Sequence, residues 1–365
     1  MIPTPYAHAP ANAQQSVGPV ETPPPIAFFT PSELTAYEPP EGGCLVGHNH
    51  ITKGATAVIA GAAGIGKSRV AVALAVAGAR GVDWMGLTVH RRFRSLIIQS
   101  ENGPLRLRDE FSAIGTNDLD GHIRVSPPPP FGFEFGNAHF VAAIKATLAD
   151  FQPDVVILDP WTATVTDDKG KDYRETLQLL KRVFGCGDES PALVIVAHTR
   201  KPGNGDRVPR GRSLMHEVAG SYVLTSHARC VFNMLPASDD TSDDRVVFEN
   251  SKNNDGKQVK PSAWHRQNGL FLPCPDFDWN AYNGKQERGR SKIGRGDLRE
   301  VFEQAGGSMT RQEAAKALMA SVGCSKSVAY DALKNDGPFA EYLAAEGAMI
   351  RWSEPETEVS ESDHA

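Results

Sequence analysis

One eight-residue segment limits what this chain can fold into more than any other. It follows a short apolar run (residues 55–60) and precedes an alanine-rich run (69–79), so its surroundings predict a strand, a loop and a helix in that order. The spacing G-x-x-x-x-G-K-S lets backbone N–H groups wrap a phosphate, and the helix start adds partial positive charge. The segment consists of Gly61, Ala62, Ala63, Gly64, Ile65, Gly66, Lys67 and Ser68.

This segment predicts a site for a nucleoside triphosphate, with ATP and Mg²⁺ as the expected ligands. Lys67 is expected to contact the β- and γ-phosphates, and the Ser68 hydroxyl to bind Mg²⁺. The alternative is a Gly/Ala-rich turn with a chance lysine. It explains neither the strand before the loop nor the helix after it.

Three further apolar runs each lead to a polar residue that can serve such a site. Asp159 is expected to hold Mg²⁺, Glu101 to orient the attacking water, and His198 to sense the γ-phosphate. Parallel strands align their carboxyl ends at one edge of a sheet, so these side chains are expected near the loop. Each also has a structural interpretation: Asp159 as a cap, Glu101 as the cap of a helix over 105–111, and His198 as a packed histidine.

Composition excludes several classes of protein. A net charge of -6 over 365 residues argues against a globally basic nucleic-acid binder. The five cysteines are widely spaced and form no C-x-x-C, which argues against a zinc site and a disulfide framework. No apolar run approaches membrane-spanning length and the first residues lack a signal pattern, so we expect a cytoplasmic protein without a membrane partner.

Composition also divides the chain into segments. Residues 1–40 are Pro-rich and expected to be disordered, whereas 41–283 alternate strand-like and helical runs, as in a parallel α/β sheet. Residues 284–297 are expected to form a flexible basic linker. A helical domain is expected over 298–353 and an acidic solvated tail over 354–365.

The C-terminal domain has the pattern of a helix-turn-helix. Thr310 and Glu313 form a capping-box pattern, Gly323 marks a turn, and Ser325 can cap a second helix. The apolar run 348–352 is a candidate wing strand, so a winged-helix domain is also compatible. The alternative is a small helical module for protein interaction or oligomerisation.

The region 44–283 resembles RecA-like ATPases, and most closely the RepA-type hexameric replicative helicases of plasmids and phages. The resemblance rests on the phosphate loop, Gln99-Ser100-Glu101-Asn102, Ile157-Leu158-Asp159, His198-Thr199-Arg200-Lys201 and a Gly-Ser segment at 220–221. It implies self-association into a ring, with a cation reaching the neighbouring subunit's nucleotide. The family's arginine before Gly-Ser is Ala219 here, so Arg210, Arg212 or Lys252 is expected to substitute.

A basic loop over 200–212 follows His198. It carries Arg200, Lys201, Arg207, Arg210 and Arg212 on a Gly/Pro-rich backbone, which suits a phosphodiester chain without base specificity. Single-stranded DNA is therefore the expected partner. An ordinary solvated surface loop is the alternative.

Together these patterns predict an α/β protein: a RecA-like P-loop NTPase with a mainly parallel central sheet and a small helical, helix-turn-helix or winged-helix C-terminal domain. The resemblance implies an ATP-hydrolysing, ring-forming DNA helicase or helicase-like replication protein of a mobile element. The alternative is an ATP-switched DNA-binding regulator or loader without unwinding activity. A small-molecule kinase fits the basic loop and the C-terminal pattern less well.

Overall fold

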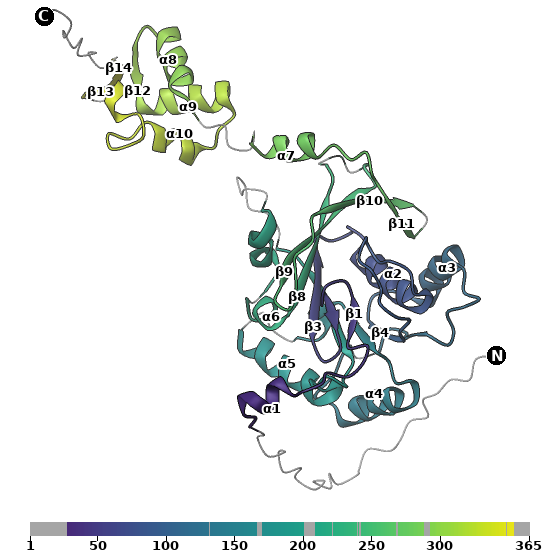
Figure 1. The fold of residues 1–365 in the computed structure, drawn as a ribbon. Helices are drawn as coiled ribbons and strands as arrows, with labels where there is room; N and C mark the ends of the chain where they lie inside the picture. Colours follow the sequence, from purple (N-terminus) through teal and green to yellow (C-terminus); the bar gives the residue numbers. More distant parts are fainter. Residues whose placement is uncertain are drawn as a thin grey trace, which may run out of the picture. The chain divides into compact units, whose positions relative to one another are not determined.

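The computed structural model describes residues 28–353 with short gaps (Figure 1). The gaps are residues 131, 166–169, 201–208, 221, 239, 241, 268, 288–292 and 348. The chain divides into two compact units, residues 1–39 and 40–365. In the first unit, helix α1 (Pro31–Thr35) begins at a capping box of Thr30 and Glu33. Most of the expected disordered segment and all of the expected acidic tail lie outside the described residues.

A nine-stranded sheet is the main element of the second unit. The strands from β8 to β5 in the order below are parallel, and β9, β10 and β11 are antiparallel additions on one side. This arrangement confirms the expected fold class, an α/β fold with a mainly parallel central sheet. The spatial order is β11 (Leu270–Pro273), β10 (Ser262–Gln267), β9 (Arg245–Asn253), β8 (Cys230–Pro236), β3 (Thr56–Gly61), β7 (Ala192–His198), β6 (Val155–Asp159), β4 (Ser95–Gln99) and β5 (Ile123–Val125).

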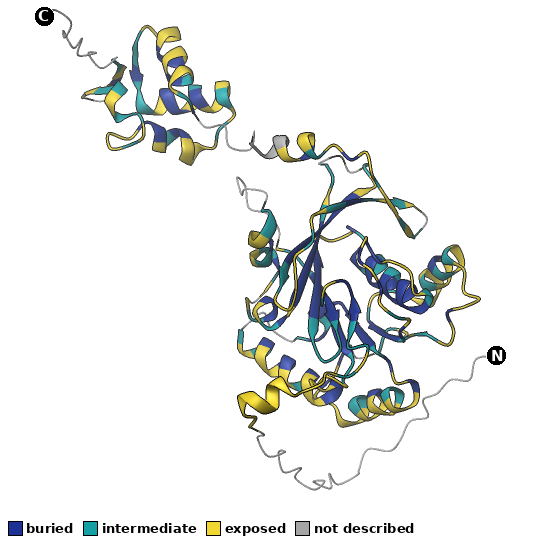
Figure 2. Cartoon of the chain, viewed as in Figure 1, coloured by how far each residue is buried: buried dark blue, intermediate teal, exposed yellow. Residues whose placement is uncertain are grey.

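Helices cover both faces of this sheet, which is why its inner strands are apolar along their length (Figure 2). Helix α2 (Lys67–Arg80) packs on one face, and α4 (Ala138–Phe151) and α5 (Gly170–Phe184) pack on the other. Successive residues of β3 alternate between the two cores, Val58 in one and Ile59 in the other. Gly78 of α2 is required by close packing, because a Cβ there would collide with the ring of Phe93.

The parallel strands give the sheet two different edges. At the carboxyl edge β3 ends in Gly61 beside His198 of β7. At the amino edge β8 begins at Cys230, after helix α6 (Tyr222–His227). Because β9 is antiparallel to β8, its last residue Asn253 pairs with Cys230 and lies at the amino edge. Helix α3 (Pro104–Ile114) follows β4 at the carboxyl edge.

The C-terminal residues have an apolar core of their own, which includes Leu298, Phe302, Leu318, Leu333 and Ile350. The expected caps at Thr310 and Ser325 are confirmed, and the expected strand is β14. Helices α7 and α8 enter the range 284–297, expected as a linker, from both ends. The elements are α7 (Trp279–Glu287), α8 (Arg295–Gln304), β12 (Ser308–Thr310), α9 (Arg311–Val322), α10 (Lys326–Ala332), η3 (Ala340–Tyr342), β13 (Leu343–Glu346) and β14 (Met349–Trp352).

The remaining elements are short. Strands β1 (Cys44–Val46) and β2 (Ile51–Thr52) pair with each other, and 3-10 turns occur at η1 (Trp161–Ala163) and η2 (Gly211–Glu217). Within the part of the chain that the structure describes, none of the helices has the length and apolar character needed to cross a lipid bilayer.

Candidate functional site

The phosphate loop connects β3 to α2 at the carboxyl edge. Gly64 and Gly66 have φ angles of 75° and 101°, in the left-handed region that favours glycine. Gly66 precedes α2 without a side-chain cap, so the N–H groups of the first helical turn are left for an anion. A Cβ at Gly61 would lie 2.9 Å from the carbonyl oxygen of Met234, so the loop also needs glycine where it meets β8.

Lys67 and His198 meet beside this loop. The Lys67 ammonium donates to the Ala62 carbonyl oxygen at 2.8 Å and lies 3.2 Å from Nδ1 of His198. Burial lowers the pKa of Lys67, against the opposing charges of Asp159 and Glu101. Burial, followed by the charge of Lys67, also lowers the pKa of His198, so this imidazole is neutral at pH 7 and can accept from the lysine. An arriving phosphate would compete for Lys67 and thereby release His198.

Asp159 and Ser68 form the second part of the site. Asp159 is 5% exposed, and burial raises its pKa, opposed by a hydrogen bond from the side chain of Ser68. A hydroxyl and a carboxylate beside a phosphate loop are the hard oxygen donors that Mg²⁺ prefers. The two residues therefore fit the expected metal, and a cation there would compensate a carboxyl group that burial otherwise disfavours in its charged form.

A turn held by two side-chain hydrogen bonds places Glu101 in the same pocket. The buried Gln99 side chain donates from Nε2 to the Asn102 carbonyl oxygen at 2.9 Å and accepts from the Asn102 N–H at 2.7 Å. Gln99 precedes Glu101 and Asn102 follows it, so these two bonds fix the turn that carries Glu101. The carboxylate is exposed to the pocket and free to approach a water molecule.

One cavity of about 360 Å³ joins these groups with residues that the sequence motifs did not reveal. Arg266 of β10 donates from Nη1 to the Gly64 carbonyl oxygen at 3.1 Å, and its Nη2 lies 3.3 Å from Oδ1 of Asp244. Arg69 follows the loop directly, a position that could have indicated it, whereas no local signal marks Arg266. The lining consists of Gly64, Gly66, Lys67, Ser68, Arg69, Glu101, Asn102, Arg106, Asp159, His198 and Arg266.

Two expected site residues lie outside this cavity. Arg212 is exposed on η2. Lys252 lies at the amino edge, where its ammonium donates to the carbonyl oxygens of Thr225, Ser226 and Ala228 at 2.9, 3.3 and 2.6 Å. In its own chain Lys252 therefore caps the end of α6, and the structure does not bring it to the nucleotide site.

The basic loop is only partly described, since Lys201 and Arg207 lie outside the described residues. Two of its other cations bind within the chain. Arg200 Nε lies 2.8 Å from Oε2 of Glu217. The Arg210 guanidinium stacks 3.6 Å from the centre of the Tyr282 ring.

A phosphate loop between a parallel strand and a helix, a buried aspartate at the end of a second strand and a glutamate in the turn after a third define a P-loop ATPase domain. The chain belongs to the AAA domain family, which matches residues 22–204, half of its 365 residues. A KaiC-like protein of the hyperthermophilic archaeon Pyrococcus horikoshii, known from a crystal structure, is similar at a TM-score of 0.45 and 15% identity. That similarity covers 65% of this chain and 99% of the archaeal one. No curated protein matches the sequence.

Proposed function

We propose that this chain hydrolyses ATP at the carboxyl edge and uses the energy for work on DNA, as a ring-forming helicase or helicase-like replication protein of a plasmid, phage or other mobile element. The observation that carries the hydrolysis is the convergence of Lys67, Asp159 and Glu101 in one cavity. The RepA-type resemblance and the position of the basic loop, directly after His198, support the DNA part.

Each residue has a defined task in this proposal. The Glu101 carboxylate orients a water molecule for in-line attack on the γ-phosphate and accepts its proton. Lys67 stabilises the charge that develops on the transferred phosphoryl group, and Arg266 adds a cation from the same chain. Ser68 and Asp159 would hold Mg²⁺, which neutralises phosphate charge when bound.

His198 would connect hydrolysis to DNA. Its ring contacts Lys67, and it is the last residue of β7. A movement of His198 on phosphate binding would therefore displace the residues that directly follow it. The Thr199 N–H donates to Gly61, and Arg200 pairs with Glu217 of η2, so the start of the basic loop is tied to both the phosphate loop and η2. Loss or gain of a phosphate can therefore shift Thr199 and Arg200, which directly follow His198.

The proposal is tested by measuring ATP turnover with and without single-stranded DNA, together with the assembly size in a non-hydrolysable ATP analogue. We expect DNA to stimulate turnover and the analogue to promote ring-sized particles. A strand-displacement assay on a forked duplex should show ATP-dependent unwinding. An ATP turnover rate that DNA does not change, in a protein that stays monomeric, would contradict the helicase proposal.

A second candidate is an ATP-switched DNA-binding regulator or loader, which the C-terminal domain favours. Helices α9 and α10 are joined by a turn at Gly323, and a three-stranded sheet of β12, β14 and β13 completes the domain, as in a winged helix. The positive charge at α10 is modest, because Lys334, which follows the helix, pairs with Asp331 of the helix at 2.6 Å. A regulator would bind a defined duplex site, turn ATP over slowly and unwind nothing.

A further inference from the structure

Helix α3 buries a charged residue and exposes an apolar one. Glu110 is its one buried residue, whereas Leu105 is 65% exposed. Phe111 and Ile114 of the same helix pack against the core that includes α2, as in an ordinary amphipathic helix. That packing does not explain why a carboxyl group is the most buried side chain of the helix.

The Glu110 carboxyl group is only half satisfied. Its Oε2 lies 3.6 Å from Nη2 of Arg106, whereas no described residue hydrogen-bonds the buried Oε1. Burial raises the pKa of Glu110, and the nearby cations Arg106 and Arg69 oppose this shift. A buried acceptor without a donor is destabilising, so the position is explained if a ligand supplies the missing N–H group.

Glu110 lines a hollow of about 750 Å³ that adjoins the phosphate cavity. Arg69 and Arg106 line both spaces, so one ligand can extend from one into the other. Figure 1 shows α2 and α3, the helices that carry these residues, side by side. The turn of the β10–β11 hairpin lies across the hollow, because a Cβ on Gly269 would be 3.7 Å from Cγ of Glu110.

We propose that this hollow holds the base of the bound nucleotide and that Oε1 of Glu110 accepts a hydrogen bond from the adenine amino group. This inference rests on the proposed function, since it states how the same site recognises its substrate. Arg106 offers a donor beside the Glu110 acceptor, which matches the amino donor and ring-nitrogen acceptor on the adenine edge. The exposed Leu105 side chain offers an apolar surface for the face of the ring.

The test compares three ligands by isothermal titration calorimetry: Mg·ATP, Mg·purine riboside triphosphate, which lacks the amino group, and inorganic tripolyphosphate. The wild-type protein should prefer ATP to the purine analogue by about tenfold or more, the scale of a hydrogen bond to a charged group. In Glu110→Leu this preference should fall to about one, while tripolyphosphate binds as in the wild type. Glu110→Gln retains a carbonyl acceptor and should keep part of the preference. Ser112→Ala, on the exposed side of α3, should keep all of it.

The other outcomes overturn the inference in distinguishable ways. Equal affinity of the wild-type protein for ATP and the purine analogue would show that no residue recognises the adenine amino group. This comparison uses only the wild-type protein, so it does not depend on whether a variant folds. A preference that survives in Glu110→Leu would place the base elsewhere. Weaker tripolyphosphate binding by Glu110→Leu would make Glu110 a structural partner of Arg106. If the wild type binds neither ATP nor tripolyphosphate, the proposed function itself fails.

Discussion

The two edges of the central sheet both gather cationic side chains, but the helices present opposite ends to them. At the carboxyl edge α2 begins, and Lys67 lies beside uncapped N–H groups that attract an anion. At the amino edge α5 and α6 end, and their C-terminal carbonyl groups attract cations instead. We therefore expect a lysine at the first edge to bind a ligand and a lysine at the second to stabilise the fold.

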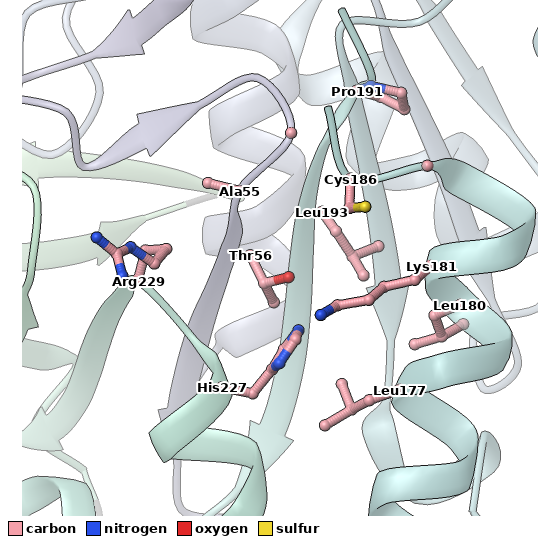
Figure 3. A pocket seen from close by; sticks show the side chains of 12 residues that line it. Ala55, Thr56, Leu177, Leu180, Lys181, Cys186, Pro191, Leu193, His227 and Arg229 are labelled. Atoms are coloured by element: carbon pink, nitrogen blue, oxygen red, sulfur yellow. The ribbon is translucent and has the colours of Figure 1, made fainter. Parts of the chain in front are cut away.

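The amino edge also contains a cavity, of about 270 Å³, and Figure 3 shows Lys181 and His227 pointing toward the same space beside Thr56. Lys181 lies in the last turn of α5 and His227 in the last turn of α6. Arg229 of this cavity pairs with Asp255. Burial, together with the charges of Lys181 and Lys252, lowers the pKa of His227, so this ring is neutral. The last-turn Lys181 and the Arg229–Asp255 ion pair are explained without a ligand, in contrast to the buried Asp159 and Glu110 at the carboxyl edge. A cluster of cations is thus weaker evidence for a site than a buried polar group that lacks compensation.

The largest contrast is expected between two lysine substitutions. Lys67→Met should lose ATP turnover by about 10²–10³-fold or more and bind nucleotide weakly, because the phosphates lose their direct cation. Lys252→Met should retain ATP binding. ATP turnover and calorimetric ATP binding, measured on both variants, check this contrast. Wild-type turnover in Lys67→Met would show that the active site does not lie at the carboxyl edge.

Glu101→Gln should separate binding from chemistry at the carboxyl edge. The amide cannot accept the proton of the attacking water, so turnover should fall by roughly 10²-fold or more while ATP affinity stays near the wild-type value. Single-turnover hydrolysis and equilibrium binding give the two quantities. Unchanged hydrolysis would assign the base to another residue.

Lys252→Met should instead destabilise the fold. Removal of three charge-assisted hydrogen bonds to the end of α6 leaves those carbonyl groups unpaired, with an expected loss on the order of 3 kcal/mol in the free energy of unfolding. Urea denaturation of the isolated protein measures this loss. A variant with wild-type stability but defective turnover in the assembled protein would instead support the expectation that Lys252 acts across a subunit interface.

His50 gives a smaller, pH-dependent effect near the amino edge, where the adjacent Asn49 donates to the Asp255 carbonyl oxygen. Burial lowers the pKa of His50 to about 4. Its unfolded value is about 6.5, so the unfolded chain binds the extra proton and stability is lost as pH falls from about 6.5 toward 4. Between pH 7 and pH 5 the wild type should lose about 2 kcal/mol relative to His50→Gln. The free energy of unfolding of both proteins, measured by urea denaturation, checks this difference. The same pH dependence in the wild type and in His50→Gln would contradict the role given to His50.

Sequence patterns predicted the parts of the site that follow from local order. The phosphate loop is contiguous. Asp159 and His198 end buried parallel strands and Glu101 follows the end of a third, so the shared edge brings them together. The fold class followed from the same alternation of apolar strands and helices.

The remaining parts of the site depend on how strands far apart in the sequence pair with one another, which local sequence patterns do not reveal. Arg266 reaches Gly64 across 202 positions through an antiparallel hairpin. Lys252 lies far from its own chain's phosphate loop, at the amino edge, because β9 runs opposite to β8, a direction that its residues do not reveal. Arg210 packs on Tyr282 of the distant helix α7, a contact that no local pattern indicates.

Hydrogen–deuterium exchange with and without a non-hydrolysable Mg·ATP analogue tests the central claim most directly, because it reports on both edges in one experiment. We predict slower exchange in peptides covering 61–70, 99–107 and 264–271, at the carboxyl edge. Peptides covering 177–186 and 227–231, at the amino edge, should be unchanged. Protection confined to the amino-edge peptides, with the phosphate loop unaffected, would contradict the assignment of the nucleotide site.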